Sequence, residues 1–167
     1  VMTISTNIGT INWTPTMTGN YNISIEVSDG ELSDTQSYTI QVELPTPELS
    51  LSPTSFSASS GTQITVHVDV ENVIDLMGGT ITLDFDASIL QYSSSSKGSF
   101  IPNATLFESS IDNTGGSVLL DIAGLGTDAY ASGDGRIISI TFDSTNSTGT
   151  STICFDSTTL KDKDNNT

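Results

Sequence analysis

The sequence predicts an all-β protein built from β-sandwich modules, and three observations support this. Short segments in which apolar and polar residues alternate recur along the whole chain, and this period of two is typical of strands with one buried face. Clusters of Ser, Gly and Asn separate the segments, as expected of turns. No stretch of ten residues shows a convincing helical period. A chain of 167 residues with 35% hydrophobic content can form one large or two small cores.

The first predicted module covers residues 1–43. Its clearest feature is a pair of alternating segments at residues 21–27 and 38–42, with the turn residues Ser28, Asp29 and Gly30 between them. This pattern predicts an antiparallel pair with one buried face. Together with residues 9–15, the pair resembles the closing half of a cadherin-like or immunoglobulin-like surface repeat.

Such a half-repeat has about three strands, which is too few to protect its edges and bury its apolar face alone. Two explanations stay open. The preceding half could belong to the native precursor, or strands from another chain could fill the gap, as in strand-complemented polymers. Tandem occurrence of such repeats favours the first, so the chain is interpreted as a segment of a longer precursor.

The boundary between modules is predicted at residues 44–48. Pro45 and Pro47 favour extended backbone and lack the amide donors that a sheet requires. The second module is therefore expected to cover residues 49–167.

Seven segments of the second module are predicted to be strands of a two-sheet sandwich. They are residues 49–51, 62–70, 80–85, 90–92, 117–122, 137–142 and 152–155. Alternation predicts that the inward side chains include Ile64, Val66, Val68, Val70, Ile81, Leu83, Phe85, Val118, Leu120, Ile138, Ile140, Phe142, Ile153 and Phe155. The single cysteine, Cys154, lies in the last segment and is predicted to be a small buried hydrophobe.

The order of six short motifs in this module resembles that of cohesin modules. The motifs are VHVDVENV at 66–73, GTITLDFD at 79–86 leading to Leu90, GSF at 98–100, GDG at 133–135, ISITF at 138–142 and LKD at 160–162. The resemblance implies a jelly-roll sandwich of nine strands in a secreted or cell-surface protein. It also implies a non-catalytic adhesion or scaffold module that binds a dockerin-like protein. The chain ends where the family pattern turns into one more strand, so this module is expected to lack its last strand.

The resemblance also suggests a partner-binding face. In dockerin-binding members, one sheet face recognises the partner's helices, and its contacts include polar residues on the strand that here runs through residues 78–85. Gly78 and Thr80 occupy positions that carry an Asn and an Asp in many members, which removes groups that would orient a partner. The segments at 117–122 and 137–142 are expected to share that face. Asp121, Ser139 and Thr141 are therefore further candidate contacts.

The net charge of the chain limits the classes of molecule that it is expected to bind. Twenty acidic and four basic residues give a formal net charge of −16, which repels nucleic acids and anionic membranes and favours cations or basic partners. No apolar run approaches the roughly 18 residues of a membrane span, so this segment is not expected to insert into a membrane. The expected partner is another protein or further copies of the chain.

Catalytic and metal-binding patterns are weak. His67 alternates with Asp69 and Glu71, so the three share one face, which is interpreted as the solvent face of a strand. No nucleophile or carboxylate pair stands out, and an enzyme is not predicted.

Calcium is the one candidate cofactor. The oxygen-bearing residues Asp162, Asp164 and Asn166 have the spacing that begins a calcium loop. An EF-hand loop has glycine at its sixth position, where this chain has Thr167. A hairpin turn is the simpler interpretation.

Four candidate glycosylation sites follow the Asn-X-Ser/Thr pattern: Asn12, Asn22, Asn103 and Asn146. Asn103 and Asn146 lie in predicted loops, where a glycan would fit.

Two alternative functions stay open. The first is a structural subunit of an extracellular filament or surface array, closed by strand exchange between copies. The second is a carbohydrate-binding module, which requires at least two exposed rings on one surface. The available rings are Trp13, Tyr21, Tyr38, Tyr92 and Tyr130. Alternation places Tyr21 and Tyr38 inward.

Overall fold

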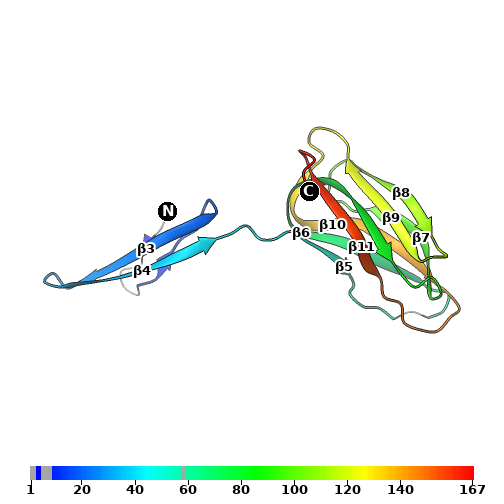
Figure 1. Cartoon of the computed structure of the whole chain (residues 1–167), viewed down its shortest axis with the longest axis horizontal. Helices are drawn as coiled ribbons and strands as arrows, with labels where there is room; N and C mark the ends of the chain where they lie inside the picture. The colour runs from blue at the N-terminus through cyan, green and yellow to red at the C-terminus, as the bar shows by residue number, and fades with distance from the viewer. Residues whose placement is uncertain (1–2, 5–8, 58) are drawn as a thin grey trace. The chain divides into compact units, whose positions relative to one another are not determined.

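The structure is a computed structural model that describes residues 3–4, 9–57 and 59–167. It divides into two compact units, Val1–Pro45 and Thr46–Thr167. Every regular element in the described ranges is a β-strand, as Figure 1 shows, and the predicted all-β class is confirmed. None of these residues forms a helix long and apolar enough to cross a membrane.

The first unit is built around one long hairpin. Strands β3 (Gly19–Ser28) and β4 (Ser33–Val42) pair in antiparallel register from Gly19 opposite Val42 to Ser28 opposite Ser33. The carboxylate of Asp29 closes the turn by accepting the N–H groups of Glu31 at 3.0 Å and Leu32 at 2.9 Å. These bonds lower the pKa of Asp29. The predicted antiparallel pair is confirmed. The short strands β1 (Thr3–Ile4) and β2 (Ile11–Asn12) pair with each other.

The apolar face of this hairpin is only partly covered. The rings of Trp13 and Tyr21 pack edge to face with centroids 4.6 Å apart, and Tyr21 donates a hydrogen bond to the Met17 carbonyl. Tyr38 lies opposite Ile23 on the apolar face of the hairpin, as alternation predicts, yet 40% of it is exposed. A two-stranded sheet has too few neighbouring side chains to bury its outer rings.

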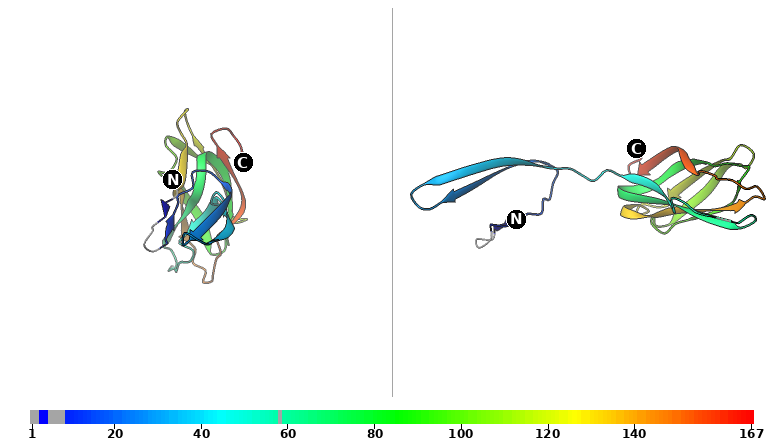
Figure 2. Two further views of the ribbon diagram at one scale, coloured as in Figure 1. Left: turned by 90° about the vertical axis from the view of Figure 1, so that its left-hand side faces the viewer. Right: turned by 90° about the horizontal axis from the view of Figure 1, so that it is seen from below.

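The second unit is a sandwich of two sheets, visible as facing layers in Figures 1 and 2. Its strands are β5 (Glu48–Ser52), β6 (Gln63–Asp84), β7 (Leu90–Lys97), β8 (Ala104–Asp112), β9 (Ser117–Gly124), β10 (Ala131–Ser144) and β11 (Cys154–Asp162). We call the order β5-β6-β10-β7 sheet A and the order β8-β9-β6-β11 sheet B. The predicted sandwich is confirmed, with β6 belonging to both sheets.

Strand β6 passes from one sheet to the other at a bend around residues 72–76. Asn72 and Asp75 have positive φ angles of 55° and 52°, a region that Asn and Asp tolerate better than most residues. Asp134 accepts the N–H of Asn72 at 2.7 Å, and Ser132 accepts that of Asp75 at 2.8 Å. The segment Ser132–Asp134 of β10 therefore holds the bend in place. The sequence predicted two separate strands here, at 62–70 and 80–85, where the structure has one.

The core lies between the two sheets. Twelve of the fourteen predicted inward side chains are buried, and Ile153 and Phe155 are partly buried against them. The ring of Phe142 packs edge to face on Phe85 and Tyr92. Each fully buried Val, Leu or Ile contributes roughly 1.5–3 kcal/mol relative to exposure.

Cys154 is exposed, so its predicted burial is wrong. Successive side chains of a strand point to opposite faces, and the inward positions here are taken by Ile153 and Phe155. The prediction chose the wrong phase of the alternation for this one residue.

Strand β8 was not predicted. Its sequence ATLFESSID places Leu106 and Phe107 side by side, and a bulge between Glu108 and Ser110 shifts the register against β9. Both features interrupt the alternation that marks a strand in sequence. The bulge also re-aims the side chains of β8.

A hydrogen-bonded cluster joins the two sheets along one side of the sandwich. Glu108 on β8 of sheet B accepts hydrogen bonds from the hydroxyls of Tyr92 and Ser95 on β7 of sheet A. Burial and the Glu108 carboxylate raise the pKa of Tyr92 to about 12. The same bonds, first that from Tyr92, lower the pKa of Glu108.

Candidate partner-binding face

The predicted partner contacts divide between the two sheets. Thr80 on β6 lies directly opposite Asp121 on β9, and Gly78 lies two residues earlier on β6, all in sheet B. Ser139 and Thr141 lie on β10, which pairs with the first half of β6 in sheet A. The expectation that all five residues share one face is therefore wrong for Ser139 and Thr141.

The physical reason is the bend in β6. A strand that belongs to both sheets offers two sets of neighbours, and the sequence does not show which half β10 joins. Ser139 lies opposite His67, whose Nδ1 is 2.9 Å from the Ser139 hydroxyl, and Thr141 lies opposite Thr65 with their hydroxyls 3.3 Å apart. At the centre of the outer face of sheet A, polar side chains of β6 and β10 thus bind one another.

Asp121 is the central polar group on the outer face of sheet B. One carboxylate oxygen accepts a hydrogen bond from the hydroxyl of Thr80, and the other accepts one from the hydroxyl of Ser109. Both donors lie on neighbouring strands, so the half-buried carboxylate is fixed in orientation. Among the described residues no Lys or Arg forms an ion pair with it. It can therefore accept a further donor from outside.

Apolar side chains surround this carboxylate. Phe107 lies opposite Asp121 and is 49% exposed, and Leu119 and Ala123 lie two residues to either side of Asp121 on β9, half-buried. An exposed aromatic ring beside an oriented polar group is typical of the centre of a protein interface. Sequence reading missed Phe107 because it missed β8. The adjacent apolar pair Leu106 and Phe107 was the signal that one of them points outward.

Gly78 and Gly79 create a shallow hollow beside Thr80 on the same face. A Cβ atom on Gly78 would lie 2.3 Å from the Ile122 carbonyl oxygen, and one on Gly79 would lie 2.5 Å from that of Thr159. Backbone this close leaves no room for a side chain, which explains glycine at position 78. The hollow has a volume of about 340 Å³ and its rim includes Asp121 and Lys161.

The predicted calcium residues form a tight turn after β11. The Asp162 carboxylate accepts the backbone N–H groups of Asp164 at 2.9 Å and Asn166 at 2.8 Å, and the Asn166 side-chain amide at 3.0 Å. These bonds lower the pKa of Asp162. Lys163 binds both Asp164 and Asp75 at 3.0 Å. No group of three or more His, Cys, Asp or Glu residues in the described ranges is placed to hold a metal. Calcium binding by this turn stays a prediction.

The predicted glycosylation sites are all exposed. Asn12 and Asn22 lie in strands β2 and β3, whereas Asn103 and Asn146 lie outside strands. Sequence reading overlooked a fifth matching tripeptide, Asn165-Asn166-Thr167. Glycosylation itself stays a prediction.

The other candidate groups have structural partners. On the outer face of sheet A, Asp69 accepts a hydrogen bond from Arg136 at 3.0 Å beside the His67–Ser139 pair. Of the rings that a carbohydrate site would need, Tyr92 is buried, and Trp13 packs against Tyr21. Of the five rings, only that of Tyr38 is exposed. This arrangement does not favour sugar stacking.

Comparison with known proteins agrees with the geometry. A family model for the cohesin domain matches residues 49–167, and one for a putative Ig domain matches residues 1–43. A search of curated proteins gave no significant match.

Solved structures with the same fold include several cohesins. The sixth cohesin of scaffoldin B from Acetivibrio cellulolyticus, solved with a mutant Cel5 dockerin, is 18% identical with a TM-score of 0.60, over 72% of this chain and 89% of that one. The OlpA cohesin of Clostridium thermocellum, solved with dockerin Doc918, is 20% identical with a TM-score of 0.60, over 73% and 90%. A non-cellulosomal cohesin from the archaeon Archaeoglobus fulgidus is 21% identical with a TM-score of 0.53, over 64% and 72%.

These identities establish a shared fold, and the family model adds membership. Cohesin domains are non-catalytic protein-binding modules, in agreement with the absence of an enzymatic pattern in the sequence. From residue 49 to residue 167, this chain belongs to the cohesin family.

Proposed function

We propose that this protein is an extracellular or cell-surface module that binds a dockerin-like protein through the outer face of sheet B. The observation that carries the proposal is the oriented Asp121 carboxylate beside the exposed Phe107 ring. Two structurally similar cohesins were solved in complexes with dockerins. Cohesin and Ig-like domains are typical of surface scaffold proteins, which supports a location outside the cell.

The two outer faces differ in what they offer a partner. On sheet A, the central side chains Thr65, His67 and Asp69 each bind a side chain of β10. On sheet B, Phe107, Leu119 and Ala123 provide apolar area around one carboxylate. Burial of an aromatic side chain contributes more to binding than exchange of hydrated hydroxyls. This difference favours sheet B as the binding face.

Asp121 also compensates for the orienting polar side chains that are missing at Gly78 and Thr80. Many family members carry polar side chains at those β6 positions, whereas here a carboxylate on the adjacent strand contacts Thr80 directly. An orienting hydrogen-bond acceptor is thus present on the face, supplied by β9 in place of β6. Its charge, in a chain of net charge −16, suits a partner that presents Lys, Arg or hydroxyl donors.

The test is a titration of the whole chain with calcium-loaded dockerins, starting with Cel5 dockerin and Doc918. We expect at least one of a panel of dockerins to bind, and Thr80→Arg to weaken that binding at least tenfold by placing a bulky cation at the centre of the face. Thr141→Arg is the matched control, because Thr141 is also a half-buried threonine on a strand flanked on both sides, but in sheet A. Equal losses for both variants, or no binding by any dockerin, would contradict the proposal.

A further inference from the structure

Strand β7 forms one edge of sheet A. It pairs with β10, and among the described residues no strand pairs with its other side, which we call the free side of β7. The sequence of the strand, LQYSSSSK, contains neither Pro nor Gly, and its one charged residue is the last. Unpaired N–H and C=O groups on an edge can pair with another chain, so natural sheets usually protect such edges with Pro, charges or a covering segment.

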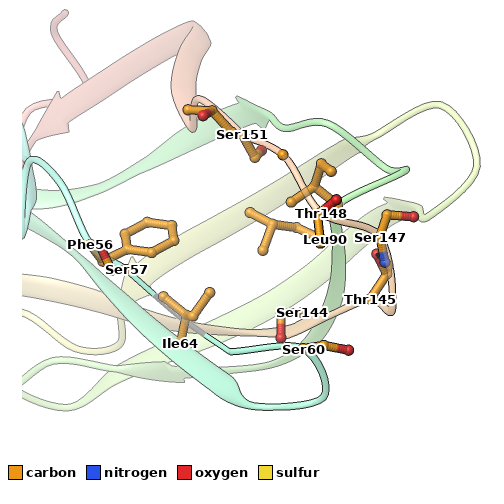
Figure 3. Close-up of a pocket in the computed structure, with 13 residues that line it drawn as sticks. Phe56, Ser57, Ser60, Ile64, Leu90, Ser144, Thr145, Ser147, Thr148 and Ser151 are labelled. Atoms are coloured by element: carbon orange, nitrogen blue, oxygen red, sulfur yellow. Dashed lines mark hydrogen bonds between the residues drawn. The ribbon is translucent and has the colours of Figure 1, made fainter.

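Backbone hydrogen bonds fix both ends of β7. The strand begins beside a pocket of about 370 Å³ whose lining includes Leu90 (Figure 3). There the Leu90 N–H donates to the Asp86 carbonyl at 2.8 Å. Directly after the strand, the Gly98 N–H donates to the Ile137 carbonyl at 2.7 Å. Residues 91–97 between these two bonds are therefore the part of β7 that another strand could reach.

The side chain of Asn113 covers the backbone groups of Tyr92 within this part. Its Oδ1 accepts the Tyr92 N–H at 2.6 Å, and its Nδ2 donates to the Tyr92 carbonyl at 3.0 Å. The backbone carbonyl of Asn113 accepts a further bond from Gln91 Nε2 at 3.1 Å. One amide side chain thus makes the two-way exchange of hydrogen bonds that a residue of a neighbouring antiparallel strand would make.

The turn that carries Asn113 is itself fixed. Asn113 directly follows β8, in the connection to β9, and is half-buried. The carboxylate of Asp112 closes this turn by accepting the N–H groups of Thr114 at 2.9 Å and Gly115 at 2.7 Å. A turn held in one conformation delivers the Asn113 amide to β7 with a smaller loss of conformational entropy than a free loop would.

Glu108 on β8 covers a second backbone group on the free side of β7. Its carboxylate accepts the Ser95 N–H at 3.2 Å and the Ser95 hydroxyl at 2.9 Å. The hydroxyl of Tyr92 donates to the same carboxylate. A strand that paired here would have to displace this carboxylate and take up its negative charge beside the new pair, which is unfavourable.

We propose that Asn113 and Glu108 are edge-protecting residues, which prevent β7 from pairing with β7 of a second copy of the chain. A second copy is the occupant that the bare edge would favour. An antiparallel pair of β7 strands around a two-fold axis joins uncharged Ser-rich segments and keeps the two Lys97 side chains at opposite ends. The two bound side chains therefore keep this edge of the module closed to other copies.

Amide hydrogen exchange of the whole chain, followed by NMR, tests the protection residue by residue. Asn113→Ala should speed exchange of the Tyr92 amide at least tenfold and leave that of Ser95 unchanged, whereas Glu108→Ala should speed exchange of Ser95. Thr114→Ala, at an exposed position in the same turn, is the matched control and should change neither amide. Unchanged exchange of Tyr92 in Asn113→Ala would overturn the proposal.

Sedimentation velocity over a wide concentration range tests the consequence. The double variant Asn113→Ala/Glu108→Ala should self-associate with a dissociation constant at least tenfold below that of the wild type. Ser94→Lys, added to the double variant, places a charge in the middle of β7 and should restore the sedimentation of the wild type. Double-variant sedimentation equal to that of the wild type, or association that Ser94→Lys leaves in place, would overturn the proposal.

Two features keep the outcome clear. Should the double variant fail to fold, Asn113→Ala with and without Ser94→Lys repeats the sedimentation test, because this variant alone already frees both backbone groups of Tyr92. Neither measurement uses a dockerin, so the edge proposal and the proposed binding face on sheet B fail independently.

Discussion

The outer faces of sheets A and B use the two halves of the same strand, β6, yet they differ in chemistry. In sheet A, the outward residues of β6 are Thr65, His67, Asp69 and Glu71, and the first three are bound by neighbours on β10. In sheet B, the second half of β6 presents glycine and threonine beside the apolar residues of β8 and β9. A face whose polar groups already bind one another gains little from a partner, whereas a face with an exposed ring gains by covering it.

Gly78→Val should produce the largest effect, because it separates the strands that build the sheet B face. The new Cβ would lie 2.3 Å from the backbone oxygen of Ile122, so β6 and β9 must move apart. We expect the free energy of unfolding to fall by about 2–4 kcal/mol, measured by urea denaturation. Thr82→Val on the same strand is the control, expected to cost about 1 kcal/mol or less through loss of its bond to Ser157. Equal costs would show that the close approach of β6 and β9 is not required.

Phe107→Ala, on the outer face of sheet B, should weaken dockerin binding much more than a substitution on the outer face of sheet A. Truncation of a central aromatic residue at an interface typically costs about 2 kcal/mol or more, which is roughly a thirtyfold loss of affinity. Phe107 is half exposed, so the stability of the free chain should change by about 1 kcal/mol or less. Calorimetric titration with the dockerin that binds the wild type gives the affinity. His67→Ala, on the outer face of sheet A, should bind the dockerin as the wild type does. A comparable loss of affinity in this variant would contradict the placement of the partner on sheet B.

The cluster that joins the sheets at β7 and β8 predicts a pH dependence. The pKa of Glu108 is lowered in the folded state, so its contribution to stability is present above the unfolded pKa and is lost as the pH falls through the folded value. Glu108→Gln should therefore be less stable than the wild type at pH 7, by about 1 kcal/mol or less because the carboxylate is exposed. Thermal melts at pH 7 and pH 3 should show the difference shrinking in acid. If the stability difference between Glu108→Gln and the wild type persists at pH 3, the charge of Glu108 is not its cause. The control is Glu71→Gln, which changes an exposed glutamate of sheet A in the same way.

Arg136→Ala on the outer face of sheet A should have the smallest effect. Arg136 pairs with Asp69 at 3.0 Å, and both side chains are partly exposed. Exposed ion pairs contribute about 0–1 kcal/mol and weaken further in salt. Denaturation at low and high salt should show a small loss that disappears at high salt. A loss of several kcal/mol would mean that the polar face of sheet A carries more of the fold's stability than its exposure suggests.

The contrast between faces also shows what sequence can predict. Alternation located most of the inward residues, because one buried face leaves a period of two that survives in a single sequence. The resemblance to cohesin modules placed Thr80 and Asp121 among the candidates, and the structure brings these two together. It could not assign Ser139 and Thr141 to the correct sheet, because strand pairing is set by contacts distant in sequence.

Irregular strands account for two further errors. The bend of β6 depends on hydrogen bonds that its backbone N–H groups donate to Ser132 and Asp134, which lie about sixty residues away. The bulge in β8 disrupts the very periodicity that would reveal the strand. Phe107, the exposed ring of the proposed binding face, lies in that strand, so the binding face was harder to predict than the core.

The continuity of β6 has a consequence for how the sandwich opens. Both halves of β6 are central strands, one in each sheet, and they are joined at the bend at residues 72–76. Detaching β6 from one sheet would therefore also disturb its pairing in the other. Local opening that frees one face alone is thus disfavoured, and backbone amides in both halves of β6 should exchange with deuterium at one common rate set by global unfolding. Strand β5, which among the described residues pairs with β6 alone, should exchange first, so that this edge of sheet A opens while the two faces stay intact.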